Sequence, residues 1–292
     1  MRKCCLILTL MVMALLAGSC SRRPLVEVDN NVLLNITIDT SIANYDAPVL
    51  PKMMRAVFFD SKTGDYVSHS FVNQRGGYAY LMPGREYDIL VYSFDAESSA
   101  IIEGDHNLND IFACTSPVSE SMKEKLDGYV EKIEEEKIVY EPDHLFVGKL
   151  EDVYVPVRGY GKPPFEIDIC ARTVVQTWVV EIDKVHGAEQ IESVSGVISG
   201  LADHSLIGRR EPSYDQATVF LDTVSLAEDG HVYAKFNTFG CNALAGHNQV
   251  LSLVFTYTGG GNFSFVVDIS DKFKDNPLQS ILIETDGIEA LP

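Results

Sequence analysis

The sequence predicts an all-β protein built from two tandem antiparallel β-sandwiches with a small helical insertion. Short runs of β-branched, aromatic and other apolar residues recur along the chain, bounded by Gly, Pro, Asn and Asp. Most of these runs follow one another at intervals of about 10 to 15 residues without an intervening helix, as in antiparallel sandwiches. The chain of 292 residues is also long enough for two ordinary domains.

Residues 1–19 have the features of a secretory signal peptide. Two basic residues precede an apolar run at 6–16, which is shorter than the roughly 20 residues needed to span a bilayer. Small residues then lead to Cys20, and a cysteine in this place resembles the bacterial lipoprotein signal. There the thiol is acylated and the preceding peptide bond is cut, so we expect lipidation of Cys20 and a short tether over 20–31. An ordinary secretory cleavage, with Cys20 uninvolved, is the alternative.

The net charge excludes one class of partner. The formal charge is −19, and removal of Arg2 and Lys3 with the signal peptide makes it −21. A surface so acidic repels nucleic acid and anionic lipid headgroups. We therefore expect no nucleic-acid partner.

Cysteine usage predicts no disulfide framework. Cys114, Cys170 and Cys241 are the only cysteines after Cys20, and none of them belongs to a CxxC pair. Three thiols form one bridge at most, and we expect unpaired thiols packed in the core.

The N-terminal domain is predicted over residues 32–157. The sequence NQRGG at 73–77 predicts the turn of a hairpin. Residues 119–137 break the β pattern, because they are rich in Glu and Lys and carry apolar residues at helical spacing after a candidate cap at Ser119. They predict a surface helix or a mobile insertion, with a partner-binding helix as the alternative. Strands are expected at 32–39, 54–60, 66–72, 78–82 and, after a turn, within 83–95.

The C-terminal domain is predicted over residues 158–292. Two glycines and two prolines at 157–167 make this segment the best candidate for the domain boundary. A long or bent strand is expected directly after it, at 165–183. Further strands are expected at 193–201, 217–224 and 231–240, in a hairpin at 250–270, and at 280–285.

No catalytic or metal-binding motif stands out, so we expect neither enzyme activity nor a cofactor. Residues 105, 107 and 109 alternate as the first ligands of a calcium loop do, but Asp110 and Ser116 replace the glycine and glutamate that such a loop needs. Serines at 195, 199 and 205 lie near His204 without forming a GxSxG motif, which leaves open only a triad assembled from distant residues. Trp178 lies within an apolar run and is expected to pack in the core rather than to stack on a sugar.

Several blocks along the chain resemble a family of Bacteroides-type lipoproteins. This family is similar to the fimbrillin superfamily, in particular to the anchor and accessory subunits of Bacteroidales (type V) fimbriae. The resemblance runs in order through the mature chain. Its blocks are CSRRPL (20–25), AVFFD (56–60), MPGREYDILVYSFD (82–95), TSPVSE (115–120), IVYEPDHLFVG (138–148), FNTFG (236–240) and VDISDKF (267–273).

The resemblance implies two transthyretin-like (Greek-key) sandwiches and a structural or adhesive role at the outer membrane. It predicts a fimbrial anchor or accessory subunit whose partner, a fimbrillin-like subunit, adds a β-strand to an exposed edge of the second sandwich. A surface glycan-binding lipoprotein is the alternative. Ser21, Arg22 and Arg23 stand where surface-exported lipoproteins of this kind often carry acids, so these residues do not secure surface display and leave the periplasmic face open. The outer face is favoured because an anchor for a fimbrial or adhesive partner must reach outward.

Overall fold

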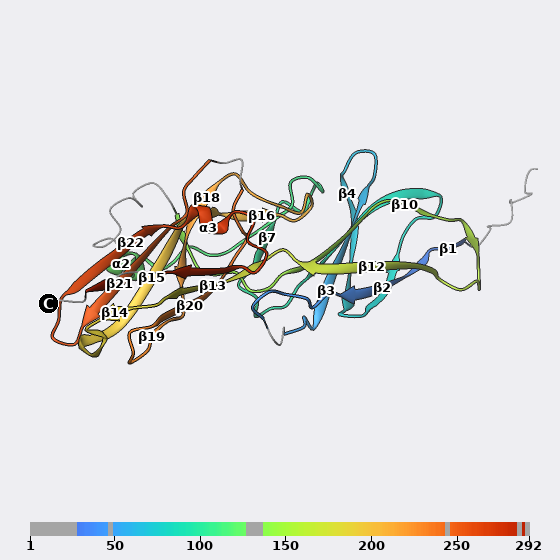
Figure 1. The fold of residues 1–292 in the computed structure, drawn as a ribbon. Coiled ribbons are helices and arrows are strands. Elements are labelled where there is room, and N and C mark those ends of the chain that lie inside the picture. The colour runs from blue at the N-terminus through green and yellow to red at the C-terminus, as the bar shows by residue number, and fades with distance from the viewer. Residues whose placement is uncertain (1–27, 46–48, 127–136, 243–245, 285–287, 290–292) are drawn as a thin grey trace, which may run out of the picture.

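The computed structural model describes residues 28–45, 49–126, 137–242, 246–284 and 288–289, and β-strands dominate them. The strands form two units that lie end to end in an elongated molecule (Figure 1). Helical structure in the described part of the chain is limited to the short helices α2 (Glu120–Leu126) and α3 (Ser270–Phe273) and one 3-10 turn, Ala188–Gln190. The predicted all-β class is confirmed.

The first unit, which we call the barrel unit, is a closed arrangement of seven strands in the order β10-β12-β2-β5-β4-β3-β6. Every neighbouring pair is antiparallel except β12 and β2, which run parallel. Alternate residues of each strand point inward, and the interior holds large side chains such as Phe58, Tyr87 and Phe146. The seven strands are β2 (Asn31–Ile38), β3 (Met53–Asp60), β4 (Tyr66–Asn73), β5 (Gly76–Tyr80), β6 (Arg85–Ser93), β10 (Phe146–Val155) and β12 (Phe165–Thr173).

The predicted hairpin at 73–77 joins β4 and β5. Gly76 has a φ of 112°, and a Cβ there would lie 1.8 Å from the carbonyl oxygen of Leu34 on β2. Only glycine permits β5 to come so close to β2 at this position, where the pairing of the two strands begins.

The second unit, the sandwich unit, packs a five-stranded sheet against a four-stranded sheet. The orders are β22-β21-β15-β18-β9 and β19-β20-β13-β23. Both sheets contribute to one core, in which Trp178 packs on Phe273 at 4.2 Å between ring centroids, as expected for a core tryptophan. The strands are β9 (Lys137–Val139), β13 (Gln176–Ile182), β15 (Ile191–Ala202), β18 (Gln216–Leu221), β19 (Val224–Leu226), β20 (Val232–Thr238), β21 (Val250–Tyr257), β22 (Asn262–Asp268) and β23 (Ser280–Ile283).

The strand pairing departs from the predicted division at 157/158. The chain turns within 157–164, at the far end of the barrel unit, and residues 165–167 already belong to β12, which pairs with β2 and β10. The expected long strand at 165–183 is instead two strands, β12 and β13, and the chain passes between the units at Val174 and Val175. A Gly/Pro-rich segment marks a turn of any kind, so its composition could not show that both flanking strands belong to one unit.

The segment between β6 and β10 also crosses the predicted division. β9 pairs parallel with β18 in the sandwich unit, and two short strands, β7 (Ile101–Glu103) and β8 (Phe112–Cys114), pair with each other. β8 also pairs with β16 (His204–Leu206), and β16 pairs in turn with β17 (Glu211–Pro212). A mixed apolar cluster, including Phe59, Leu145 and Phe239, fills the junction between the units.

Helix α2 lies inside the predicted insertion at 119–137. The hydroxyl of Ser119 accepts a hydrogen bond from the backbone N–H of Met122 at 3.3 Å, as expected of a cap. Leu126 is buried against Val197 and Phe220, so α2 covers part of the outer face of the five-stranded sheet. Residues 127–136 of the predicted insertion lie outside the described residues. No helix among the described residues is long and apolar enough to cross a membrane.

Candidate partner-binding edge

The sheet edges of the sandwich unit differ in how well they are protected. The three-residue strand β9 is covered by residues 116–118, since Pro117 forms a bridge with Val139. On β23 the ammonium group of Lys272 donates a hydrogen bond to the carbonyl oxygen of Leu282 at 2.8 Å. β19 has only three residues. β22 has seven residues, and in the part of the chain that the structure describes no strand pairs with its outer side.

β22 has the side-chain pattern of a half-covered edge strand. Phe263, Phe265 and Val267 point toward the core and are only partly buried. Phe263 stacks on Phe255 of β21, with ring centroids 4.6 Å apart and an angle of 8° between the planes. Val266 points the other way and is 56% exposed. A further strand beside β22 would therefore bury apolar surface in addition to forming backbone hydrogen bonds.

The hydrogen bonds at both ends of the β21–β22 hairpin fix which backbone groups point outward. Tyr257 N–H donates to the oxygen of Gly261, and Ile269 N–H donates to the oxygen of Gln249. In an antiparallel pair, bonded positions alternate with unbonded ones, so residues 263, 265 and 267 bond to β21. The N–H and C=O groups of Ser264 and Val266 consequently point away from β21, toward the open side.

The end of β22 is fixed by polar contacts. Asp268 accepts hydrogen bonds from the backbone N–H of Ser270 at 2.9 Å and from its hydroxyl at 2.5 Å, and these bonds lower the pKa of Asp268. The Ser270 hydroxyl in turn accepts a hydrogen bond from the backbone N–H of Gln249 at 2.9 Å. The strand therefore passes directly into α3 and is held in position at this end.

β22 is also remote from the N-terminal end of the described chain. Figure 1 shows β22 at the end of the molecule where the C-terminus lies, whereas β1 (Val28–Asp29), the first described strand, lies at the opposite end. β22 and β1 are thus separated by most of the length of the molecule.

A second feature lies beside the junction of the units. The rings of Tyr66, His69, Phe71 and Phe94 follow one another at centroid separations of 6.1, 5.3 and 5.4 Å. Phe71 is 51% exposed and Phe94 is 42% exposed, and the guanidinium of Arg55 lies 6.0 and 5.9 Å from these two rings. Phe94 also lines a cleft of about 490 Å³ with residues of both units. Exposed aromatic rings beside a cleft can stack on a flat ligand face.

A partly buried carboxylate, Glu141, connects the junction to the sandwich unit. Its oxygens accept hydrogen bonds from the backbone N–H groups of Asp222 and Asn237, both at 2.9 Å. Burial nevertheless raises the pKa of Glu141 to about 7. The neighbouring His144 accepts or donates hydrogen bonds at Thr173 and Thr177, and burial lowers its pKa.

The residues that the sequence singled out for chemistry lie in structural contacts. Asp105 forms an ion pair with Arg55 at 2.9 Å, and the amide of Asn107 donates hydrogen bonds to Thr63 and Asp65, so this loop supports the start of β4. Within the described ranges, no group of three or more His, Cys, Asp or Glu side chains is placed to hold a metal ion.

The serines near His204 are divided between two sheets. Positions 195 and 199 belong to β15, whereas His204 and Ser205 belong to β16. The imidazole of His204 lies 3.5 Å from Asp203, and this hydrogen bond lowers the pKa of the carboxyl group.

Cys20 lies outside the described residues. The three cysteines within them, Cys114, Cys170 and Cys241, are free thiols as predicted, but the expectation that they pack in the core is wrong for Cys170, which is exposed on β12. Cys114 and Cys241 are half-buried, and burial raises the pKa of both.

Sequence reasoning found the hairpin at 250–270 but not that its second strand is an edge. Edge position depends on which strands pair, and no local pattern encodes that. The alternation of Phe263, Ser264 and Phe265 was the available signal, because a strand buried on one side only alternates in this way. The aromatic row was missed because Tyr66 and Phe94 are distant in sequence.

A family model described as a domain of unknown function (DUF5119) matches residues 19–222. Comparison with curated protein sequences finds no relative. Among solved structures, a candidate adhesin from Bacteroides ovatus ATCC 8483 superposes with a TM-score of 0.67 at 21% identity, covering 93% of this chain and 96% of that one.

Two further structures share the fold. The fimbrial anchor protein Mfa2 from Porphyromonas gingivalis gives a TM-score of 0.53 at 14% identity, with 87% of this chain and 90% of that one covered. A candidate polysaccharide-binding protein (DUF1812) from Bacteroides thetaiotaomicron VPI-5482 gives 0.51 at 11% identity, with 88% and 90% covered. The chain thus belongs to the DUF5119 family, and it has the fold of fimbrial anchor and adhesin-type proteins of the Bacteroidales.

Proposed function

We propose that this chain is an outer-membrane lipoprotein that serves as a fimbrial anchor, accessory or adhesion-type structural subunit. In this account residues 1–19 are the signal peptide, lipid on Cys20 holds the N-terminus, and a fimbrillin-like subunit adds a strand to β22. We also propose that the barrel unit and the sandwich unit each have a transthyretin-like (Greek-key) topology. The long open edge of β22 is the observation that carries the proposal, and the fold shared with the fimbrial anchor protein Mfa2 supports it.

Strand addition suits this edge for physical reasons. Backbone groups of an incoming strand would pair with the outward N–H and C=O groups of Ser264 and Val266. Apolar side chains of that strand would cover Phe265 and its neighbours on the inner face, and the alternate positions would give specificity. The partner would thus complete a sheet that this chain leaves with one open side.

A proline substitution in β22 tests whether the partner pairs with this edge. Val266→Pro removes an outward N–H but no bond to β21, so the fold should persist while capture of the partner is lost. Val266→Thr keeps the N–H and provides the matched control, and it should capture the partner as the wild type does. The measurement is crosslinking in intact cells followed by pull-down through this chain. Equal recovery of a fimbrillin-like subunit with Val266→Pro, shown to be folded by circular dichroism, would exclude the β22 edge.

A glycan-binding surface lipoprotein is the second candidate, and the aromatic row at Phe71 and Phe94 favours it specifically. The fold shared with a candidate polysaccharide-binding protein adds support. A glycan array separates the two functions. Saturable binding to one glycan that is lost in Phe71→Ala would establish this candidate, whereas binding unaffected by Phe71→Ala would exclude the row as its site.

A further inference from the structure

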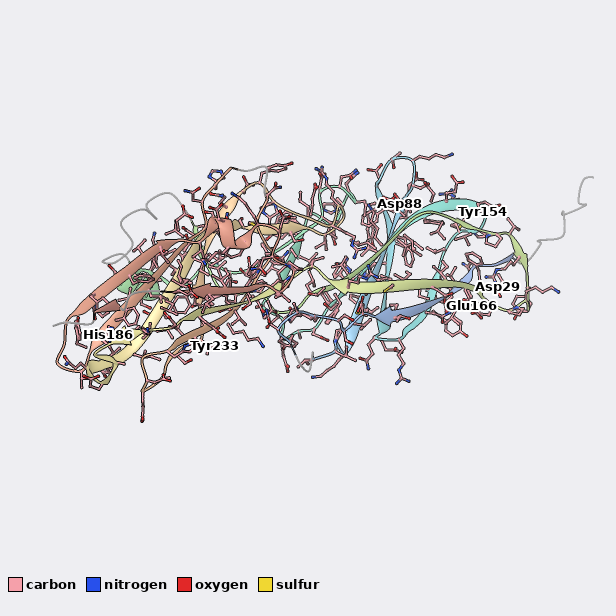
Figure 2. All side chains as sticks on the ribbon, viewed as in Figure 1. Asp29, Asp88, Tyr154, Glu166, His186 and Tyr233 are labelled. Carbon is pink, nitrogen blue, oxygen red and sulfur yellow. The ribbon has the colours of Figure 1, made fainter. Side chains whose placement is uncertain are left out.

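The end of the barrel unit nearest the N-terminus carries a group of exposed apolar side chains. Three segments meet there: β1 pairs with β11 (Arg158–Gly159), Leu81 N–H donates to the oxygen of Asn30, and Gly84 N–H donates to the oxygen of Val155. Figure 2 shows Asp29 and Tyr154 at this end of the molecule. We name the group the end patch, and it consists of Tyr80, Met82, Tyr154, Val157 and Tyr160, which are 67, 59, 53, 64 and 78% exposed.

The patch is built on a fixed frame rather than on loose loops. The guanidinium of Arg158 donates hydrogen bonds to the carbonyl oxygens of Asn31 and Pro163, which ties the β11 turn to β2. The Tyr87 hydroxyl donates to the carbonyl oxygen of Met82 at 3.0 Å, so the 81–84 turn is attached to the barrel interior. This frame therefore holds the patch residues at the end of the barrel unit that lies opposite the sandwich unit (Figure 1).

The charge at this end differs from that of the chain as a whole. Three basic residues at this end balance three nearby carboxylates: Arg85, Arg158 and Lys162 stand against Asp29, Glu86 and Glu166 (Figure 2). The whole chain has a formal charge of −19, which repels an anionic surface. This end meets such a surface with little repulsion.

From these observations we propose that the end patch rests in the headgroup region of the bilayer to which the chain is tethered. This inference rests on the lipidation of Cys20 in the proposed function. Seven residues lie between Cys20 and Val28, so the two Cα atoms are eight steps apart and at most about 29 Å from each other even when the chain is fully extended. Tyrosine rings are enriched at membrane–water interfaces because they present an apolar body and a polar hydroxyl.

The consequence is a defined orientation. With the end patch on the bilayer, the long axis of the molecule points away from the membrane, and β22 at the opposite end is held out toward a partner (Figure 1). A second copy of the chain or another protein on the patch would be the competing occupants. The lipid is favoured because the tether begins beside the patch and is too short to carry it far.

The test uses the full lipidated chain in vesicles of phosphatidylethanolamine and phosphatidylglycerol that carry brominated acyl chains. Tyr160→Trp places a tryptophan in the end patch, and Tyr214→Trp places one at a site in the sandwich unit that is 55% exposed. The wild-type chain, with Trp178 buried, gives the baseline emission. We expect a blue shift and loss of emission for Tyr160→Trp and no change for Tyr214→Trp.

Each other outcome has a distinct meaning. Co-sedimentation with vesicles without quenching of Tyr160→Trp would overturn the end-patch inference and leave lipid anchoring intact. Equal quenching of both variants would mean that the molecule lies flat, which also overturns it. Failure of the chain to co-sediment would overturn the tether itself, and the inference with it.

Discussion

Glu141 shows how a single partly buried side chain couples the junction to pH. Its carboxylate fixes two backbone N–H groups of the sandwich unit, yet burial raises its pKa from 4.5 to about 7. The folded state therefore binds a proton there more tightly than the unfolded chain does. Stability from this group is fully present below about pH 4.5 and is lost as the pH rises through about 7.

Glu141→Gln isolates this effect. Glutamine resembles the protonated acid, so the free energy of unfolding of the variant should match that of the wild type near pH 4. Above pH 7 the variant should be more stable, by up to roughly 3 kcal/mol, because one pKa unit corresponds to about 1.4 kcal/mol. Urea unfolding of both proteins from pH 4 to pH 8 measures the difference. A difference that does not change with pH would contradict the shifted pKa.

Cys20 is the residue on which the proposed lipid anchor depends. Cys20→Ala removes the acceptor thiol, so acyl labelling should be abolished and the product should be uncut or soluble. Metabolic labelling with a palmitate analogue and membrane fractionation in high salt measure both effects. A variant that still sediments with membranes in high salt would show that the anchor is not lipid on this residue.

At the scale of elements, the β4–β5 hairpin depends on one glycine. Gly76→Ala should lower the free energy of unfolding by about 2 to 4 kcal/mol, since the new Cβ would meet the Leu34 carbonyl oxygen and strain a φ of 112°. Gly161→Ala is the matched control, because its φ is +77° but nothing lies within 4 Å of the added Cβ. That variant should lose only about 1 kcal/mol. Equal losses in urea unfolding would show that the close approach is not what requires glycine at 76.

The elements also show what the sequence can and cannot predict. Strands such as β2 and β22 were predictable, because half-buried strands alternate apolar and polar residues over seven or eight positions. β7, β8 and β9 have three residues each, which is too few for a period to be recognised. Pairings such as β9 with β18 join residues about 80 positions apart, and no local pattern specifies them.

At the scale of the whole molecule, the all-β class and the two-unit organisation followed from spacing and turn chemistry. The passage between the units at Val174 did not, because the apolar run at 165–183 reads as one strand whether it serves one sheet or two. The candidate site, too, could be predicted only in part. The family resemblance implied a partner at an exposed edge of the second unit, and only the assembled sheets single out β22. Pro117 and Lys272 occupy two of the competing edges, and the third, β19, has only three residues.

The central claim is that a partner strand pairs with β22, and site-specific photo-crosslinking in intact cells tests it most directly. A photoreactive residue at Val266 samples the open edge, and one at Leu282, 45% exposed on the blocked edge of the opposite sheet, is the control. Protease shaving of the same cells reports whether the chain faces outward. The account predicts crosslinks to a fimbrillin-like subunit from Val266 alone, together with loss of the protein on shaving. Full protection from protease with no crosslinked subunit at Val266 would contradict it.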